Sequence, residues 1–334
     1  MDDAAVMTAA ADAVAEAALA RYDFSPEATI TLANVSENTT YRVDDPRTGQ
    51  SAALRIHRPS YHSEAAIESE LCWLDALRED GVVEPPRALR TRDGSRIVTV
   101  EPGGGAPSRH VVMFEWLAGQ APSTEGDLVP SFRVLGSLAA RMQAHGARWK
   151  PPASFDRYTC DYNAGLGPNA MWGRWQNGLG LGASEREILS RLDSEILRRL
   201  TGYGVEKDRF GLAHNDLRLA NLLVAGEHIH VIDFDDCGYA WYMYDFATAV
   251  SFIELDPRVA EWMSAWLDGY TAHRSLSKSD IGMIPTLIMF RRLLLLGWVG
   301  SHHEYAKEAA ELGEGYTRLT CDLAEQYLAG RYLA

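Results

Sequence analysis

Apolar and polar residues alternate along several short segments in the first third of the chain, a pattern typical of half-buried β-strands. These segments are residues 28–33, 39–43, 52–57, 87–92, 96–100 and 110–116. Between the second and third lies Asp-Asp-Pro-Arg-Thr-Gly at 44–49, whose composition predicts a turn. The pattern therefore predicts a sheet in this part of the chain.

Apolar residues at helical spacing appear early and then dominate the rest of the chain. The predicted helices are 2–21, 63–78, 129–146, 184–200 and a series from residue 243 to the end. Ser63 is suited to cap the second helix, and Ser184 with Glu187 has the spacing of a capping box. We therefore expect an α+β fold with two parts, a strand-rich N-terminal lobe at 1–115 and a helical lobe at 116–334.

Composition narrows the choice of partners. The 334 residues are 46% hydrophobic and carry a formal net charge of −14. This charge disfavours nucleic acid or an anionic membrane as the main partner.

The apolar run at 293–299 is too short to span a bilayer and follows Arg291 and Arg292, which predicts a buried helix. The scattered cysteines and the acidic start, Asp2 and Asp3, favour a cytoplasmic protein.

Candidate chemistry gathers around residues 214–236. Asp216, Asn221 and Asp233 flank short apolar runs, and Asp233 directly follows the predicted strand 229–232. A carboxylate at Asp216 can orient a hydroxyl and take its proton, while Asn221 and Asp233 offer oxygen ligands that Mg²⁺ prefers. Arg218 can offer a guanidinium to a migrating phosphoryl group. The spacing therefore predicts magnesium-dependent phosphoryl transfer.

The histidines of this region allow two other interpretations, a structural role and a zinc site. His214 is expected to brace the loop through hydrogen bonds rather than to act in catalysis. His228 and His230 could be ligands of a zinc hydrolase together with Asp233. However, the two histidines share one face of the predicted strand, whereas Asp233 has the opposite parity. We therefore disfavour a zinc site.

The pattern His214-x-Asp216-(x4)-Asn221-(x11)-Asp233 resembles the catalytic and metal loops of the aminoglycoside phosphotransferase and type II homoserine kinase group. The resemblance implies a bilobal protein-kinase-like fold with ATP and Mg²⁺ as cofactors. It places the general base on Asp216 and the magnesium ligands on Asn221 and Asp233. Asp245 resembles the aspartate that braces the catalytic loop from the following helix.

The resemblance extends into the N-terminal part. The cation that binds the nucleotide phosphates falls on Arg55, where many relatives have lysine, and its helix carboxylate falls on Glu70. Arginine remains charged and bidentate, so the resemblance implies that Arg55 grips the phosphates and pairs with Glu70.

Two further segments complete the implied nucleotide site. The loop at 34–39 contains Ser36 and Asn38 but no glycine, so side-chain and backbone groups are expected to approach the phosphates. The connector at 112–117 contains Glu115 and Leu117, and its backbone is expected to hydrogen-bond adenine.

The sequence thus predicts an ATP-dependent phosphotransferase whose acceptor is the hydroxyl of a small, amino-bearing metabolite or antibiotic. One alternative is a protein Ser/Thr kinase, because Arg218 stands where such kinases often carry lysine. A second is a non-catalytic nucleotide-binding protein on the same fold. The intact set of Asp216, Asn221 and Asp233 argues against it, because binding alone needs no oriented base. The acceptor's identity and the oligomeric state stay open.

Overall fold

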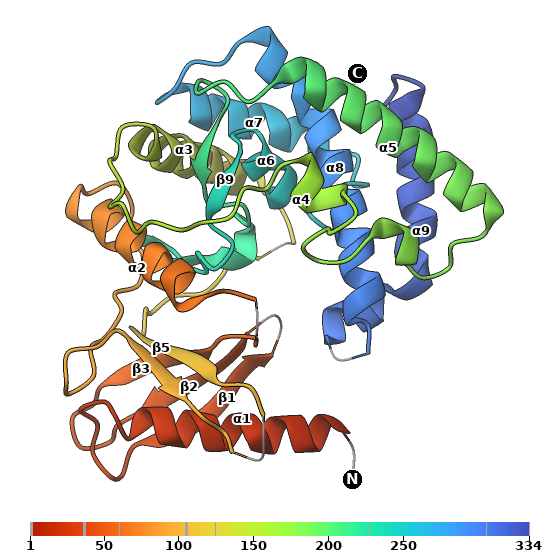
Figure 1. The fold of residues 1–334 in the computed structure, drawn as a ribbon. Helices are drawn as coiled ribbons and strands as arrows, with labels where there is room; N and C mark the ends of the chain where they lie inside the picture. Colours follow the sequence, from red (N-terminus) through yellow and green to blue (C-terminus); the bar gives the residue numbers. More distant parts are fainter. Residues whose placement is uncertain are drawn as a thin grey trace. The chain divides into compact units, whose positions relative to one another are not determined.

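The computed structural model describes residues 3–35, 38–59, 61–103, 106–123, 125–226, 228–304 and 306–333. The chain separates into two compact units (Figure 1). The N-terminal unit comprises Met1–Asp80, Glu84–Gly119 and Pro151–Asp156. The C-terminal unit comprises Gly81–Val83, Gln120–Lys150 and Arg157–Ala334.

An antiparallel sheet forms the centre of the N-terminal unit, with the strand order β1-β2-β3-β5-β4. The strands are β1 (Thr29–Val35), β2 (Thr39–Asp44), β3 (Ser51–Ile56), β4 (Ile97–Val100) and β5 (Arg109–Glu115). Each coincides with a predicted strand. The alternation of apolar and polar residues therefore located these strands correctly, because one face of the sheet is buried and the period of two is enforced.

Helix α1 (Asp3–Leu19) covers one face of this sheet, as Figure 1 shows. Val14 and Ala18 of the helix belong to one buried cluster with Leu54 and Ile56 of β3. Arg55 lies between these two strand residues and so points to the opposite face. Packing against α1 thereby fixes the face on which the Arg55 guanidinium lies.

Helix α2 (Glu64–Glu79) begins where the sequence predicted. The Ser63 hydroxyl accepts a hydrogen bond from the N–H of Ala66 at 3.1 Å and caps the helix. The helix buries Ile67, Leu71 and other residues of one stripe, and this stripe also includes Glu70. The predicted cap is therefore confirmed, and the helix presents a carboxylate within its buried face.

Two local predictions were wrong. Residues 87–92 form no strand, because only a single bridge joins Ala88 to Phe114. The Thr91 N–H donates to the Ser95 carbonyl at 2.9 Å, so turn formation takes the chain away from the sheet. The expected capping box at residues 184–187 is also absent, because helix α5 (Ala183–Tyr203) begins after Gly182 and places Ser184 inside the first turn.

Helices dominate the C-terminal unit. Besides α5 they are α3 (Val129–Gly146), α4 (Tyr162–Leu166), α6 (Tyr244–Ala249), α7 (Val259–Thr271), α8 (Lys278–His302) and α9 (Lys307–Leu328). Two small antiparallel pairs accompany them: β6 (Phe210–Ala213) with β9 (Gly238–Trp241), and β7 (Leu222–Ala225) with β8 (His228–Val231). In the described part of the chain, a capping box of Ser277 and Asp280 starts α8.

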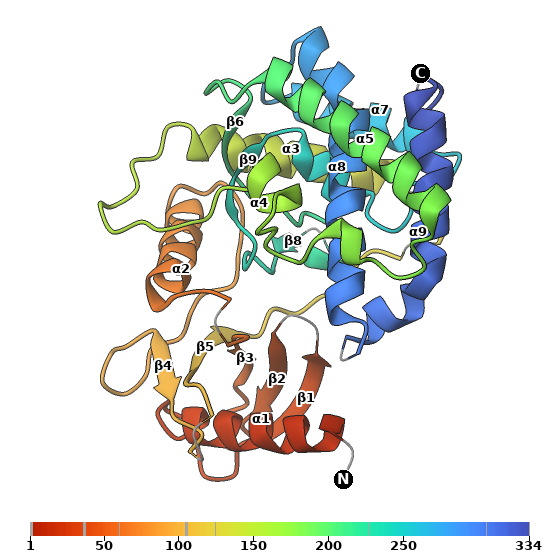
Figure 2. The same cartoon turned by 45° about the vertical axis from the view of Figure 1, so that its right-hand side comes forward.

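Helix α8 is the core helix of this unit and packs against α5 and α9 (Figure 2). It also packs against α6. It is long and apolar enough to cross a membrane, but 83% of its most apolar window is buried inside the protein. The predicted buried helix around residues 293–299 is therefore confirmed. A mostly buried helix of this kind needs no lipid to cover its apolar surface.

Helices α3 and α7 approach closely because glycines lie at their crossing. A Cβ atom on Gly136 of α3 would lie 2.0 Å from the carbonyl oxygen of Trp266 in α7. A Cβ atom on Gly269 would lie 1.9 Å from the carbonyl oxygen of Arg133. Both contacts are with backbone, so neither neighbour can rotate away.

This crossing predicts that Gly136→Ala destabilises the protein. The added methyl group must push the two helices apart, which typically costs about 1–3 kcal/mol. Gly282→Ala is the matched control, because Gly282 is an exposed helical glycine with open space around its Cβ position. Alanine there is expected to stabilise by roughly 0.5–1 kcal/mol. Urea denaturation measures both, and equal effects of the two substitutions would contradict the close crossing.

Candidate active site

The two small strand pairs bring together the loops that the sequence singled out. Asp216 and Asn221 lie between β6 and β7, and Asp233 lies between β8 and β9. The Ile232 N–H donates to the Asn221 carbonyl at 2.9 Å, which ties the end of β8 to the first loop. Residues 216, 221 and 233, which the sequence places as far as 17 positions apart, therefore belong to one local structure.

His214 braces this arrangement, as the sequence predicted. Its ring is fully buried, and Nε2 lies 3.1 Å from the Ile232 carbonyl oxygen. Its Nδ1 accepts the N–H of Asp216 at 3.3 Å. With Nδ1 an acceptor, the proton is assigned to Nε2 and the ring is a neutral hydrogen-bonding bridge between the two loops. His214 thus acts on the shape of the loop.

The loop's backbone is held by Asp245 of helix α6. Asn215 has a φ of 65°, a left-handed conformation that costs free energy for a residue other than glycine. Its N–H donates to the Asp245 carboxylate at 2.9 Å. Thr248, one turn further along α6, accepts the N–H of Leu217 at 3.1 Å. Helix α6 therefore fixes the backbone on both sides of Asp216, and the predicted role of Asp245 as a brace is confirmed.

Asp245 is itself deeply buried. Nε2 of Gln143 in α3 donates to its second oxygen at 2.8 Å, and the Tyr270 hydroxyl donates to the side-chain Oε1 of Gln143 at 2.6 Å. Burial raises the pKa of Asp245 to about 6, although the donors from Gln143 and Asn215 oppose the shift. A charge held in this place costs folding free energy, and the hydrogen bonds offset part of that cost.

Both oxygens of the Asp216 carboxylate accept hydrogen bonds. Oδ1 accepts from Nη2 of Arg291 at 2.7 Å. Oδ2 accepts from Nδ2 of Asn221 at 2.9 Å and from Nε of Arg218 at 3.2 Å. Burial opposes ionisation, but the guanidinium charges of Arg218 and Arg291 outweigh it and hold the pKa of Asp216 below its ordinary value. The buried carboxylate is therefore an anion at neutral pH.

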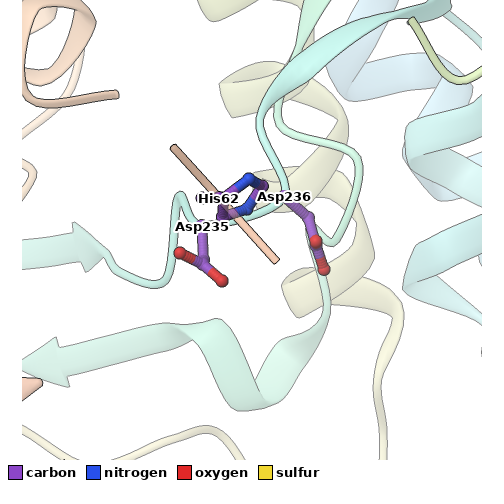
Figure 3. Close-up of side chains that lie close together, drawn as sticks. All are labelled: His62, Asp235 and Asp236. Carbon is purple, nitrogen blue, oxygen red and sulfur yellow. The ribbon is translucent and has the colours of Figure 1, made fainter. Parts of the chain in front are cut away.

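Of the two predicted metal ligands, Asn221 contacts Asp216, and Asp233 lies on the loop between β8 and β9. Both hydrogen bonds recorded for the Asn221 side chain use Nδ2, so its Oδ1 is the atom available to a cation. Asp233 is exposed and has a φ of 62°. Asp235 and Asp236 follow on the same turn, where Figure 3 shows their carboxylates. An amide oxygen and nearby carboxylates form a donor set that suits Mg²⁺.

In the N-terminal unit, the predicted ion pair forms. Nη2 of Arg55 donates to Oε2 of Glu70 at 2.6 Å, and both side chains are buried. The guanidinium also lies over the Phe114 ring, 4.9 Å from its centroid. Packing on an aromatic face and a carboxylate leaves the planar group in one orientation. A cation of fixed orientation suits the recognition of an anionic ligand.

Three further residues of the predicted nucleotide site lie within the described part of the chain. Asn38 is buried, and its Oδ1 accepts the N–H of Arg58 at 3.2 Å. The Glu115 carboxylate accepts from Arg78 at 2.7 Å, and Leu117 is half-buried two residues beyond the end of β5. Ser36 lies outside the described residues. Asn38, Glu115 and Leu117 belong to the N-terminal unit, together with Arg55.

Sequence reasoning missed Arg291. The sequence signal was a pair of arginines inside an otherwise apolar helix, which we interpreted only as the flank of an apolar run. Arg291 is 3% exposed and reaches Asp216 across a separation of 75 residues in the chain. A buried charge in an apolar helix requires a partner of opposite charge, and this rule could have led to the carboxylate.

Comparison with known proteins agrees with this geometry. A model of the phosphotransferase enzyme family matches residues 29–277, more than half of the chain. The structure of a microcompartment-associated aminopropanol kinase is 46% identical, has a TM-score of 0.88, and the match covers 96% of this chain and 99% of that one. Amicoumacin kinase of Bacillus subtilis strain 168 is 25% identical over 296 residues, 85% of this chain and 83% of that protein.

More distant structures share the fold. An amicoumacin kinase in complex with AMP-PNP, Ca²⁺ and Ami has a TM-score of 0.77 at 21% identity, and the match covers 93% of each chain. Together with the antiparallel sheet and the helical C-terminal unit, this similarity confirms the predicted α+β fold of the protein-kinase-like type.

The environment of Asp245 predicts a pH-dependent stability. Because its pKa is raised from 3.8 to about 6, the folded protein binds a proton more tightly than the unfolded chain does. The resulting stabilisation is complete below pH 4 and is lost as the pH rises through about 6, a change of roughly 3 kcal/mol at most. The Asp245→Asn variant has no titrating group at this position. The unfolding free energy of the wild type should therefore fall relative to that of the variant as the pH rises over this range. Urea denaturation from pH 4 to 7 measures it, and parallel pH profiles would exclude the effect.

Proposed function

The chain belongs to the phosphotransferase enzyme family, and we propose that it transfers the γ-phosphoryl group of ATP to the hydroxyl of a small amino alcohol. The observation that carries the proposal is the buried Asp216 carboxylate, which is held ionised and accepts a hydrogen bond from Asn221, a proposed oxygen ligand of the metal. Transfer to a hydroxyl needs an oriented base and a place for Mg²⁺, and little other covalent chemistry from the protein.

In this reaction the acceptor's hydroxyl oxygen forms a bond to the γ-phosphorus. The bond from the γ-phosphorus to the β–γ bridging oxygen breaks, and ADP leaves with that electron pair. Asp216 orients the hydroxyl and receives its proton, directly or late in the step. Arg218, which is half-buried beside Asp216, stabilises the negative charge on the phosphoryl group as it moves.

Asn221 and Asp233 are proposed to hold Mg²⁺ through their oxygen atoms. Bound Mg²⁺ neutralises the negative charge of the ATP phosphates. The donor set fits, because the amide of Asn221 is fixed by its Nδ2 bonds to the Asp216 carbonyl and carboxylate at 2.7 and 2.9 Å. The Asp233 carboxylate is exposed and can approach a bound metal–nucleotide complex.

Residues 1–115 are proposed to be the nucleotide-binding lobe, and residues 116–334 the lobe that carries catalysis and the acceptor. Arg55, held by Glu70, binds the ATP phosphates. Ser36 and Asn38 approach the phosphates from their loop, and the backbone of the connector at Glu115 and Leu117 receives adenine. The ion pair of Arg55 supports this assignment, because a buried cation of fixed orientation is suited to an anionic ligand.

The acceptor class rests on the 46% identical aminopropanol kinase, whose match extends over almost the whole of both chains. A short amino alcohol is therefore the first acceptor to test. Amicoumacin kinase, at 25% identity, supports the wider class of small amino-bearing molecules over the alternative of a protein acceptor. A cytoplasmic location, where ATP is available and the four free cysteines stay reduced, completes the proposal.

Asp216→Ala should abolish transfer and leave nucleotide binding largely intact. Loss of a general base typically costs 10²–10⁴-fold in rate, and Asp216 belongs to the other unit from Arg55. ADP release is measured with aminopropanol, ethanolamine, homoserine, an amino sugar and a protein as acceptors, and the affinity for ATP is measured separately. Asp208→Ala, which removes an exposed carboxylate just before β6, is the control. Near-normal turnover by the Asp216 variant would refute the mechanism, and transfer to protein alone would refute the acceptor class.

Arg55→Met should raise the KM for ATP by about tenfold or more, because a charge-assisted hydrogen bond contributes roughly 1.5–3 kcal/mol. The KM for the acceptor should hardly change. Arg96→Met is the matched control, since Arg96 is another arginine of the same unit and pairs with Asp75 of α2 at 2.5 Å. Steady-state kinetics with varied ATP decides, and an unchanged KM in the Arg55 variant would remove Arg55 from the nucleotide site.

A further inference from the structure

Arg291, a buried arginine of helix α8, contacts the proposed catalytic base Asp216. Nη2 of Arg291 lies 2.7 Å from Oδ1 of Asp216, and the two side chains are 4% and 9% exposed. This is the shortest of the hydrogen bonds recorded for the Asp216 carboxylate within the described residues. The contact joins the middle of the core helix to the loop between β6 and β7.

Arg291 is itself fixed from several directions. Its Nη1 donates to the Tyr244 hydroxyl at 3.2 Å, and its Nε donates to Oγ of Ser251 at 3.3 Å. The guanidinium also lies over the Trp172 ring, 4.9 Å from the centroid. These partners come from helix α6, from the turn after it, and from the segment between α4 and the Trp175–Asn177 turn. The planar guanidinium of Arg291 is therefore held in one orientation. Its hydrogen bond in turn orients the Asp216 carboxylate.

The second oxygen of Asp216 has a different environment. Arg218 reaches Oδ2 at 3.2 Å, but its side chain is 26% exposed and also lies 3.7 Å from Glu308. Glu308 lies in the first turn of α9 and is itself 52% exposed. A longer contact made by a partly exposed side chain with a second carboxylate nearby is readily exchanged. The Arg218 contact is thus weaker than the Arg291 contact, while Asn221 also holds Oδ2 through a buried hydrogen bond of 2.9 Å.

We propose that Arg291 is a positioning residue for phosphoryl transfer: it holds Oδ1 of Asp216 so that Oδ2 faces the acceptor hydroxyl when Arg218 turns to the phosphoryl group. The inference rests on the proposed function. The proton of the hydroxyl passes to Oδ2, while the β–γ bridging oxygen leaves with ADP. Asn221, which also donates to Oδ2, keeps the carboxylate plane in place during this exchange.

Orientation matters here because the base has little room for error. A displacement of about 1 Å in a reacting group can cost on the order of 10²-fold in rate. The neighbouring arginine offers a matched comparison. Arg292 is equally buried on the same helix, but it pairs with Glu254 at 2.7 Å and not with Asp216. Substitutions at these two positions therefore disturb similar surroundings and differ in the carboxylate that they release.

The experiment compares Arg291→Met, Arg291→Lys and Arg292→Lys in the full-length protein. Arg291→Met should lower kcat about 10²-fold, with the KM for ATP and for the amino alcohol within about threefold of wild type. Arg291→Lys should recover part of kcat, because an ammonium can reach Oδ1 but lacks the planar fork of donors. Arg292→Lys should lower the melting temperature and leave kcat within about threefold.

If Arg291→Met does not fold, as judged by urea denaturation, the kcat of Arg291→Lys decides, with an expected loss of about tenfold at unchanged KM. A normal kcat in the folded Arg291 variants, or equal losses of kcat in the Arg291 and Arg292 variants, would overturn the positioning role while the proposed function stands. A wild-type protein that phosphorylates no acceptor would overturn the proposed function and this inference with it.

Discussion

The buried carboxylate of Asp245 is the contact on which the rest of the site depends. It accepts the N–H of Asn215, and this hydrogen bond offsets part of the cost of the left-handed φ of 65° at that residue. The raised pKa of Asp245, about 6, shows that keeping this charge buried is unfavourable. The hydrogen bonds that Asp245 accepts offset part of this cost. Through Asp245 and Thr248, helix α6 fixes the loop on both sides of Asp216.

A second constraint is the balance of charge around Asp216. Removing a carboxylate from water disfavours its ionised form, and two guanidinium groups reverse that effect. Buried ion pairs often add little to stability, because desolvation opposes the Coulombic attraction. The main effect of Arg291 is therefore on geometry. Tyr244, Ser251 and Trp172 enclose its side chain, and the guanidinium leaves the Asp216 carboxylate few orientations.

Much of the fold and the centre of the site follow from local patterns in the sequence. Alternation located the sheet, because packing against α1 buries one face, and the same logic placed Arg55 on the other face. Local patterns failed where a nearby hydrogen bond outweighed them, as in the turn from Thr91 to Ser95 that removed a predicted strand. Motif spacing gave the loop with Asp216 and Asn221, because these residues lie five positions apart and their contact is local.

Arg291 could not be identified in that way, because its partner lies 75 residues away and the contact depends on how α8 packs. Successive residues on an α-helix point about 100° apart, so Arg291 and Arg292 must reach different surroundings. One meets Asp216 and the other Glu254. The sequence shows two adjacent charges in an apolar helix and hence the need for two carboxylates, but only the packed helix assigns them. The loop motif therefore indicates the reaction class, whereas the core helix determines how the proposed base is held.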